Sequence, residues 1–236
     1  MTQPLSSLHR RQHGGIALAV AIVVALLALG ASSWWLFGPE SRATAVDPAV
    51  LKPMPAPIAL PDTALVTDEG EPFGAGDFAG QWTLLYFGYT LCPDVCPVEL
   101  GALRQVGKLL EEQHPALAAR TQRVFISVDP ERDTHKRIRD FTAYFDPAII
   151  GATGTPDALE AFASPLGVGW SKRSNHYRDP SDREETGKDY LVDHTTAILL
   201  VDPSARLRAV FPTPHGPQPM VDAFHRYQQE QEDQPS

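Results

Sequence analysis

The chain has 236 residues, of which 43% are hydrophobic and 21% charged, a balance that excludes a collagenous or wholly disordered protein. Its formal net charge of -9 argues against a general nucleic-acid-binding protein, because such proteins carry basic patches that displace counterions from phosphate. The length fits one globular domain with additional segments.

The first element in the chain is an apolar segment. Residues 14–37 carry no charge, and the preceding residues 1–13 contain arginines and histidines. This pattern predicts one N-terminal transmembrane helix over 14–37, with 1–13 in the cytoplasm and Trp34 and Trp35 at the outer interface. The orientation indicates a single-pass protein of a bacterial inner membrane with its C-terminal domain in the periplasm. A cleaved signal peptide is the alternative, because small residues at 28–33 suit a signal peptidase.

The segments beyond the apolar stretch differ in composition. Residues 38–59 are rich in proline and predict a semi-extended spacer that contributes no core. The folded domain is expected over 60–230, with a polar C-terminal tail at 231–236. Within the domain, residues 65–70 predict a short hairpin with its turn at 68–70.

Strands and helices then alternate along the chain, and residues 171–189 form a polar surface insertion or loose hairpin. The predicted strands are 82–89, 123–128, 148–153, 196–201 and 206–211, and the predicted helices are 99–112, 134–144, 156–163 (with Thr155 as its N-cap) and 219–229. This order predicts an α/β sandwich with a mixed central sheet, in which the last two strands form an antiparallel edge.

The two cysteines of the chain, Cys92 and Cys96, follow the first long apolar strand. They are expected at a strand-to-helix turn, where the free N–H groups of the helix start favour thiolate over thiol. Gly88 and Thr90 can admit the close backbone path that such a site needs. This spacing allows the two sulfurs to share one metal ion or to close a disulfide.

His194 is the third candidate, at the border between a polar loop and a strand. If it converges with the two cysteines, two thiolates and one imidazole suit copper, the thiolates favouring Cu(I) and the imidazole Cu(II). Structural zinc fits less well because it wants four protein ligands.

Other polar side chains around these positions have simpler interpretations. Carboxylates at Asp94, Asp129 and Asp193 could orient His194 or occupy an open position, but turn, capping or solvated roles explain them equally. The remaining histidines, His215 among them, are expected to be solvated.

Three blocks of sequence together resemble the Sco/SenC family. They are Phe87–Pro97, Ser127–Thr134 and Tyr190–His194, in the family's order. The resemblance implies a membrane-anchored, thioredoxin-like domain that binds one copper ion through Cys92, Cys96 and His194. It also implies a role as a copper chaperone that delivers copper to the dinuclear copper site of cytochrome c oxidase subunit II, reduces the cysteines of that subunit, or serves another exported copper protein.

Alternative functions remain for the same cysteines. A membrane-tethered thiol-disulfide oxidoreductase would use Cys92 and Cys96 for redox chemistry and would not need His194. A peroxiredoxin-like peroxidase is a variant suggested by residues 90–93. An inert exported domain would hold the two cysteines as a structural disulfide.

Overall fold

The computed structural model describes residues 22–23, 25–26, 47–174 and 190–232. The chain divides into two compact units, Met1–Ala45 and Val46–Ser236, and the architecture below concerns the second. Most of the transmembrane segment predicted at 14–37 lies outside the described residues. Within the described part, no helix is both long and apolar enough to span a bilayer.

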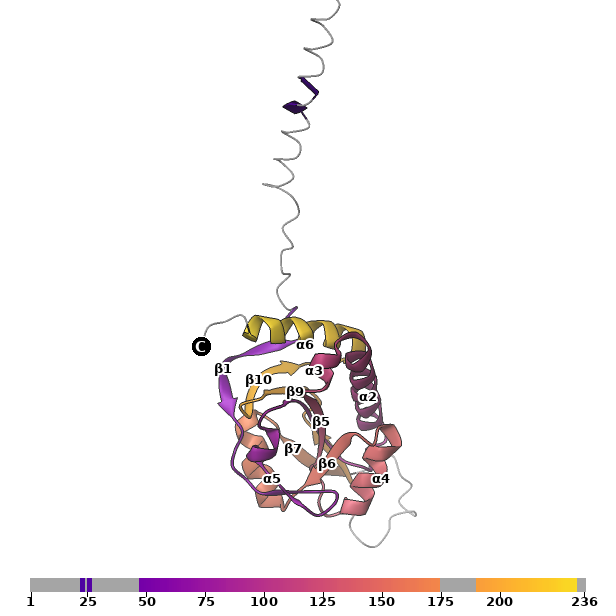
Figure 1. The fold of residues 1–236 in the computed structure, drawn as a ribbon. Coiled ribbons are helices and arrows are strands. Elements are labelled where there is room, and N and C mark those ends of the chain that lie inside the picture. The colour runs from indigo at the N-terminus through magenta and orange to yellow at the C-terminus, as the bar shows by residue number, and fades with distance from the viewer. Residues whose placement is uncertain (1–21, 24, 27–46, 175–189, 233–236) are drawn as a thin grey trace, which may run out of the picture. The chain divides into compact units, whose positions relative to one another are not determined.

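The described part of the second unit is a mixed α/β fold (Figure 1). Its strands are β1 (Lys52–Ala59), β2 (Leu65–Thr67), β3 (Pro72–Phe73), β4 (Trp82–Gly88), β5 (Thr121–Ser127), β6 (Ile149–Thr153), β7 (Trp170–Ser174), β8 (Tyr190–His194), β9 (Ile198–Asp202) and β10 (Arg206–Phe211). Its helices are α2 (Val95–Gln113), α3 (Pro115–Ala118), α4 (His135–Phe145), α5 (Pro156–Ala163) and α6 (Pro217–Glu232), with 3-10 turns η1 (Ala75–Phe78) and η2 (Ser164–Leu166).

The described strands form an eight-stranded sheet in the order β1-β10-β9-β4-β5-β6-β2-β3 and a separate ribbon of β7 and β8. β4, β5 and β6 run parallel, and β9 runs antiparallel to β4, so the predicted mixed sheet is confirmed. The prediction that the last two strands form the edge was wrong. All five residues of β9 are buried, as its interior place between β10 and β4 requires.

β1 corrects the prediction of a coreless spacer over 38–59. The strand pairs antiparallel with β10, and Leu51 just before it is completely buried. Pro53, Pro55 and Pro57 lie at the start of or within the stretch where the register of β1 against β10 shifts, between Pro53 and Ile58. An edge strand tolerates proline at such an irregularity because only one of its sides must pair with the sheet.

The sheet is covered on both faces, as the predicted sandwich requires. Trp82 packs edge-on against Phe224 and Tyr227 of α6, whereas Phe87, on the opposite face of β4, packs against Phe162 of α5. Figure 1 shows α2 and α4 together on one side and α5 on the other. β4 is therefore buried on both faces, and the segment that holds the two cysteines follows its C-terminal end.

Capping residues begin the helices where the sequence predicts. Thr134 accepts a hydrogen bond from the Arg137 N–H, and Thr155 accepts one from the Ala158 N–H, each at 3.2 Å. α2 begins at Val95, earlier than the predicted 99. Pro97 does not prevent this start, because the first-turn N–H groups of a helix have no intrahelical acceptor.

The side chain of His215 is almost fully buried, which corrects the expectation that it is solvated. Its Nδ1 lies 2.5 Å from a carboxylate oxygen of Glu99 on α2, and its Nε2 lies 2.9 Å from the Phe211 carbonyl oxygen. Burial opposes the charged imidazole, but the two hydrogen bonds outweigh it and raise the pKa of His215. Glu99 and His215 thus form an ion pair that ties α2 to the segment after β10, with side chains 4% and 1% exposed.

We expect His215→Gln to lower the free energy of unfolding by about 3 kcal/mol at pH 6, because it leaves the Glu99 charge buried without its partner. Since folding raises the pKa of His215, the pair's contribution is complete below about pH 6.5 and is lost as pH rises through the folded value. Guanidinium denaturation between pH 6 and 9 should therefore show a shrinking difference from wild type. His135→Gln, at an exposed position, is the control, and a difference constant with pH would contradict the assignment.

Candidate metal centre

The cysteine segment connects the end of β4 to the start of α2, as predicted. Cys92 lies in the turn before the helix, and Cys96 lies in its first turn. The Cys96 N–H points to the Cys92 sulfur, with an N to Sγ distance of 3.4 Å. Both sulfurs are free thiols, with Cys92 8% exposed and Cys96 completely buried.

Gly88 lets α2 approach β4 closely at this point. A Cβ atom on Gly88 would lie 2.9 Å from the Cys96 sulfur and 2.9 Å from a ring carbon of Phe125. Such distances are shorter than real Cβ contacts, so no larger residue fits without displacing the thiol or the ring. The close backbone path predicted at Gly88 is confirmed.

His194 reaches the cysteines from the end of β8. Its Nε2 lies 3.4 Å from the Cys96 sulfur, and its Nδ1 lies 2.9 Å from the Thr195 carbonyl oxygen. The rings of Tyr86 and Tyr89 meet the imidazole edge-on, with centroids 6.0 and 5.9 Å away. The imidazole is therefore held on three sides, and the nitrogen facing the cysteines is free to bind an ion once Nδ1 carries the proton.

The ligand atoms of Cys92, Cys96 and His194 lie within 4.8 Å of one another, close enough for one ion to contact all three. Among the described residues, they are the one cluster of at least three His, Cys, Asp or Glu side chains with this property. Two sulfurs and one imidazole nitrogen are a soft donor set that suits copper and leaves a structural zinc site one ligand short.

The two thiols differ in acidity. The hydrogen bond from the Cys96 thiol outweighs burial and, together with His194 and the backbone N–H groups of Cys96 and Asp94, holds the pKa of Cys92 well below its usual value. Donation of this proton to Cys92, together with burial, raises the pKa of Cys96. The two shifts have opposite directions, which favours Cys92 over Cys96 as the more acidic thiol of the pair.

Arg132 connects the segment after β5 to both sides of the centre. Its Nε donates to an Asp129 carboxylate oxygen at 2.5 Å, and another guanidinium nitrogen donates to the Tyr190 carbonyl oxygen at 2.7 Å. The guanidinium lies over the Tyr190 ring, 3.7 Å from its centroid, and 5.6 Å from that of Tyr89. Arg132 thus contacts both the strand that carries His194 and the segment that leads to the cysteines.

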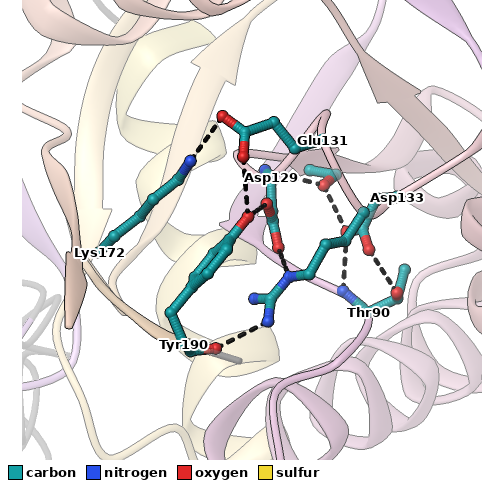
Figure 2. Close-up of polar contacts among 8 residues, drawn as sticks. Thr90, Asp129, Glu131, Asp133, Lys172 and Tyr190 are labelled. Atoms are coloured by element: carbon teal, nitrogen blue, oxygen red, sulfur yellow. Dashed lines mark hydrogen bonds and ion pairs between the residues drawn. The ribbon is translucent and has the colours of Figure 1, made fainter. Parts of the chain in front are cut away.

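Figure 2 shows the polar contacts that Asp129, Glu131 and Asp133, in the segment after β5, make with their neighbours. The Tyr190 hydroxyl donates to Asp129 at 2.6 Å, and Lys172 pairs with Glu131 at 2.6 Å. Asp133 is buried and accepts hydrogen bonds from the Thr90 N–H and hydroxyl and from the Ser127 hydroxyl. The segment after β5 is thereby fastened to the cysteine segment as well as to β7 and β8.

The carboxylates considered from the sequence lie outside the ligand cluster. Asp94 is exposed and precedes α2 without a side-chain capping bond, and exposed Asp193 pairs with Arg173 of β7 at 2.9 Å. Asp129 is buried, but it serves Arg132 and Tyr190. Sequence reasoning assigned no role to Arg132 or Tyr190, although an arginine between two acidic residues in a conspicuous block was a usable signal.

The fold and the centre define a class of protein, and the comparisons agree with it. A family model described as SCO1/SenC matches residues 57–229. The chain therefore belongs to the SCO1/SenC family, and its domain has the thioredoxin-like fold of Sco proteins.

Individual relatives show the extent of the similarity. The mitochondrial protein SCO2 homolog of Mus musculus is 36% identical over 166 residues, which span 70% of this chain and 61% of the mouse protein. The structure of Arabidopsis thaliana ScoI with copper bound matches at 31% identity with a TM-score of 0.60, covering 74% of this chain and 98% of that one. Bradyrhizobium japonicum ScoI with copper bound matches at 29% identity and a TM-score of 0.59, covering 71% and 99%.

We expect Gly88→Ala to lower the free energy of unfolding by about 2 kcal/mol, because its Cβ overpacks the contact with Cys96 and Phe125. Displacement of Cys96 should also bring the acidity of the Cys92 thiol back toward that of an ordinary cysteine, measurable as the pH dependence of its alkylation. Gly101→Ala is the matched control on α2, where a Cβ meets nothing within 4 Å and should stabilise the helix. Equal stability of the Gly88 variant and wild type would contradict the packing argument.

Arg132→Lys keeps the positive charge but cannot make both hydrogen bonds of the guanidinium fork. We expect a loss of about 2 kcal/mol in unfolding free energy, because a buried charged hydrogen bond disappears. The NMR signals of the His194 imidazole should shift or broaden, whereas those of His114 stay in place. The control is Arg173→Lys, because Arg173 forms an exposed ion pair on the ribbon of β7 and β8 that carries His194. This variant should change neither the unfolding free energy nor the His194 signals. Unchanged His194 signals in Arg132→Lys would show that Arg132 does not position His194.

Proposed function

We propose that this protein binds one copper ion through Cys92, Cys96 and His194 and passes it to another exported copper protein, with the dinuclear copper site of cytochrome c oxidase subunit II as the primary client. The observation that carries the proposal is the convergence of the three ligand atoms within 4.8 Å. Membership of the SCO1/SenC family and the two copper-bound structural relatives support the choice of metal.

The chemistry of the donor set supports transfer. Cys92 and Cys96 offer soft sulfurs that favour Cu(I), and His194 adds a nitrogen that helps to hold Cu(II). The site supplies three ligands. A client's thiolate or imidazole could therefore occupy an open coordination position before the ligands of this chain dissociate from the ion. Cys92 is 8% exposed and His194 is half-buried, whereas Cys96 is completely buried, so a client approaches from the side of Cys92 and His194.

Thiol-disulfide exchange is a second candidate, favoured by the different acidities of the two thiols. The Cys92 thiolate would attack a client disulfide, forming a mixed disulfide and releasing one client thiolate. Cys96, after losing its proton, would then attack the Cys92 sulfur, so that the client leaves as a dithiol and Cys92 and Cys96 become a disulfide. Two electrons pass from the pair to the client, and His194 is not required.

The proposed setting is a bacterial inner membrane, with residues 14–37 as a single-pass anchor and the folded domain in the periplasm. The charge distribution around the apolar segment supports this orientation. An exported domain would meet copper proteins whose sites are assembled outside the cytoplasm.

We expect the reduced full chain to bind one equivalent of copper, with a thiolate-to-Cu(II) absorption band and a Cu(II) electron paramagnetic resonance signal. Cys92→Ser and Cys96→Ser should each abolish tight binding, because one soft ligand is lost. His194→Ala should weaken Cu(II) binding more than Cu(I) binding, and His114→Ala, a histidine at the far end of α2, is the matched control.

Each outcome of this titration distinguishes the candidates. Equal loss of Cu(I) and Cu(II) in His194→Ala would refute the role given to the imidazole. If the thiols cycle through a disulfide without retaining copper, and His194→Ala changes nothing, the protein acts as a thiol-disulfide reductase.

A further inference from the structure

The hydroxyl of Tyr86 is buried without a hydrogen-bond partner. Tyr86 lies in β4 with no exposed surface, and within the described part of the chain its hydroxyl lies near the Cys96 sulfur but makes no hydrogen bond of good geometry. Buried hydroxyl groups in proteins nearly always have a partner, because an unsatisfied one retains its full desolvation cost. The position of this hydroxyl therefore calls for a physical reason.

The phenol ring of Tyr86 shares a small space with two of the three proposed ligands. A Cβ atom on Gly88 would lie 2.9 Å from the Cys96 sulfur and 3.2 Å from Tyr86 Cε1, the ring carbon next to the one that bears the hydroxyl. The same ring meets the His194 imidazole edge-on, with centroids 6.0 Å apart. The unpartnered hydroxyl thus lies at the inner wall of the centre, beside Cys96.

The chemistry of a thiol explains why the hydroxyl lacks a strong acceptor. A thiol sulfur accepts hydrogen bonds weakly, and the Cys96 thiol donates to Cys92 and lies 3.4 Å from His194 Nε2. A metal-bound cysteine has lost its proton and carries negative charge on sulfur, and hydrogen bonds to charged acceptors are about twice as strong as neutral ones. Binding of an ion at Cys96 therefore creates an acceptor beside a buried donor.

We propose that Tyr86 is a positioning residue of the metal centre, whose hydroxyl donates a hydrogen bond to the Cys96 sulfur when copper is bound. This inference rests on the proposed copper binding and adds a buried donor that favours the loaded state over the empty one. A hydrogen bond to a coordinating sulfur withdraws charge from it and tunes the potential of the bound metal.

The test compares the reduced full-length wild type with Tyr86→Phe, which removes a single oxygen atom. In the copper-free proteins, Tyr86→Phe should melt at or above the temperature of wild type, because the hydroxyl has no partner to lose. With copper, its affinity in a chelator competition should fall about tenfold, the usual effect of losing a hydrogen bond to a metal ligand. The thiolate-to-Cu(II) band should move to lower energy, because the Cys96 sulfur donates more charge without it.

Tyr227→Phe is the matched control. Tyr227 is also buried, but its hydroxyl lies beside Arg208, and its ring packs on Trp82. Its removal should leave copper affinity and the absorption band unchanged.

The remaining outcomes decide against the inference. Equal copper affinity and an unshifted band in Tyr86→Phe overturn this inference alone, and the proposed function stands. Failure of Tyr86→Phe to fold without copper would show that the hydroxyl already has a structural role, which also overturns it. A wild type that binds no copper overturns the proposed function and this inference together.

Discussion

The contact between Cys96 and Gly88 sets the distance between α2 and the sheet, and much of the domain follows from it. Gly88 has no Cβ, and this leaves room for the Cys96 sulfur against the end of β4. The first turn of α2 therefore packs on β4 and places Cys96 in the core. The same helix position brings Glu99 to His215. One short approach between helix and strand thus fixes a metal ligand and an ion pair on the same face of the sheet.

Two buried ion pairs lie near the centre, and each takes part in contacts between segments that are distant in the sequence. Arg132 and Asp129 connect the end of β5 to β8, and Glu99 and His215 connect α2 to the segment before α6. Breaking such a pair leaves an uncompensated charge in a medium of low dielectric constant. The centre is therefore enclosed by contacts whose loss is costly, which favours a fixed geometry for the ligands.

The sequence predicted the alternation of strands and helices because apolar periodicity and capping residues act locally, as Thr134 and Thr155 show. It predicted Cys92, Cys96 and His194 from residue chemistry and a family resemblance. β1 was missed because its prolines suggest an extended spacer, and only its pairing with β10, at residues 206–210, reveals a strand. Likewise, no local pattern could show that His215 is buried or that Tyr86 lacks a partner, since both depend on long-range packing.

Among the residues that the structure describes, the ribbon strands β7 and β8 pair only with each other and with no strand of the eight-stranded sheet. Cys92 and Cys96 belong to the segment fixed between β4 and α2, whereas His194 belongs to this ribbon. A displacement of His194 would cost the contacts of Arg132 and the tyrosine rings but no hydrogen bond of the large sheet. Under the proposed function, His194 would be the ligand able to move without disturbing the strand and helix that hold the two cysteines.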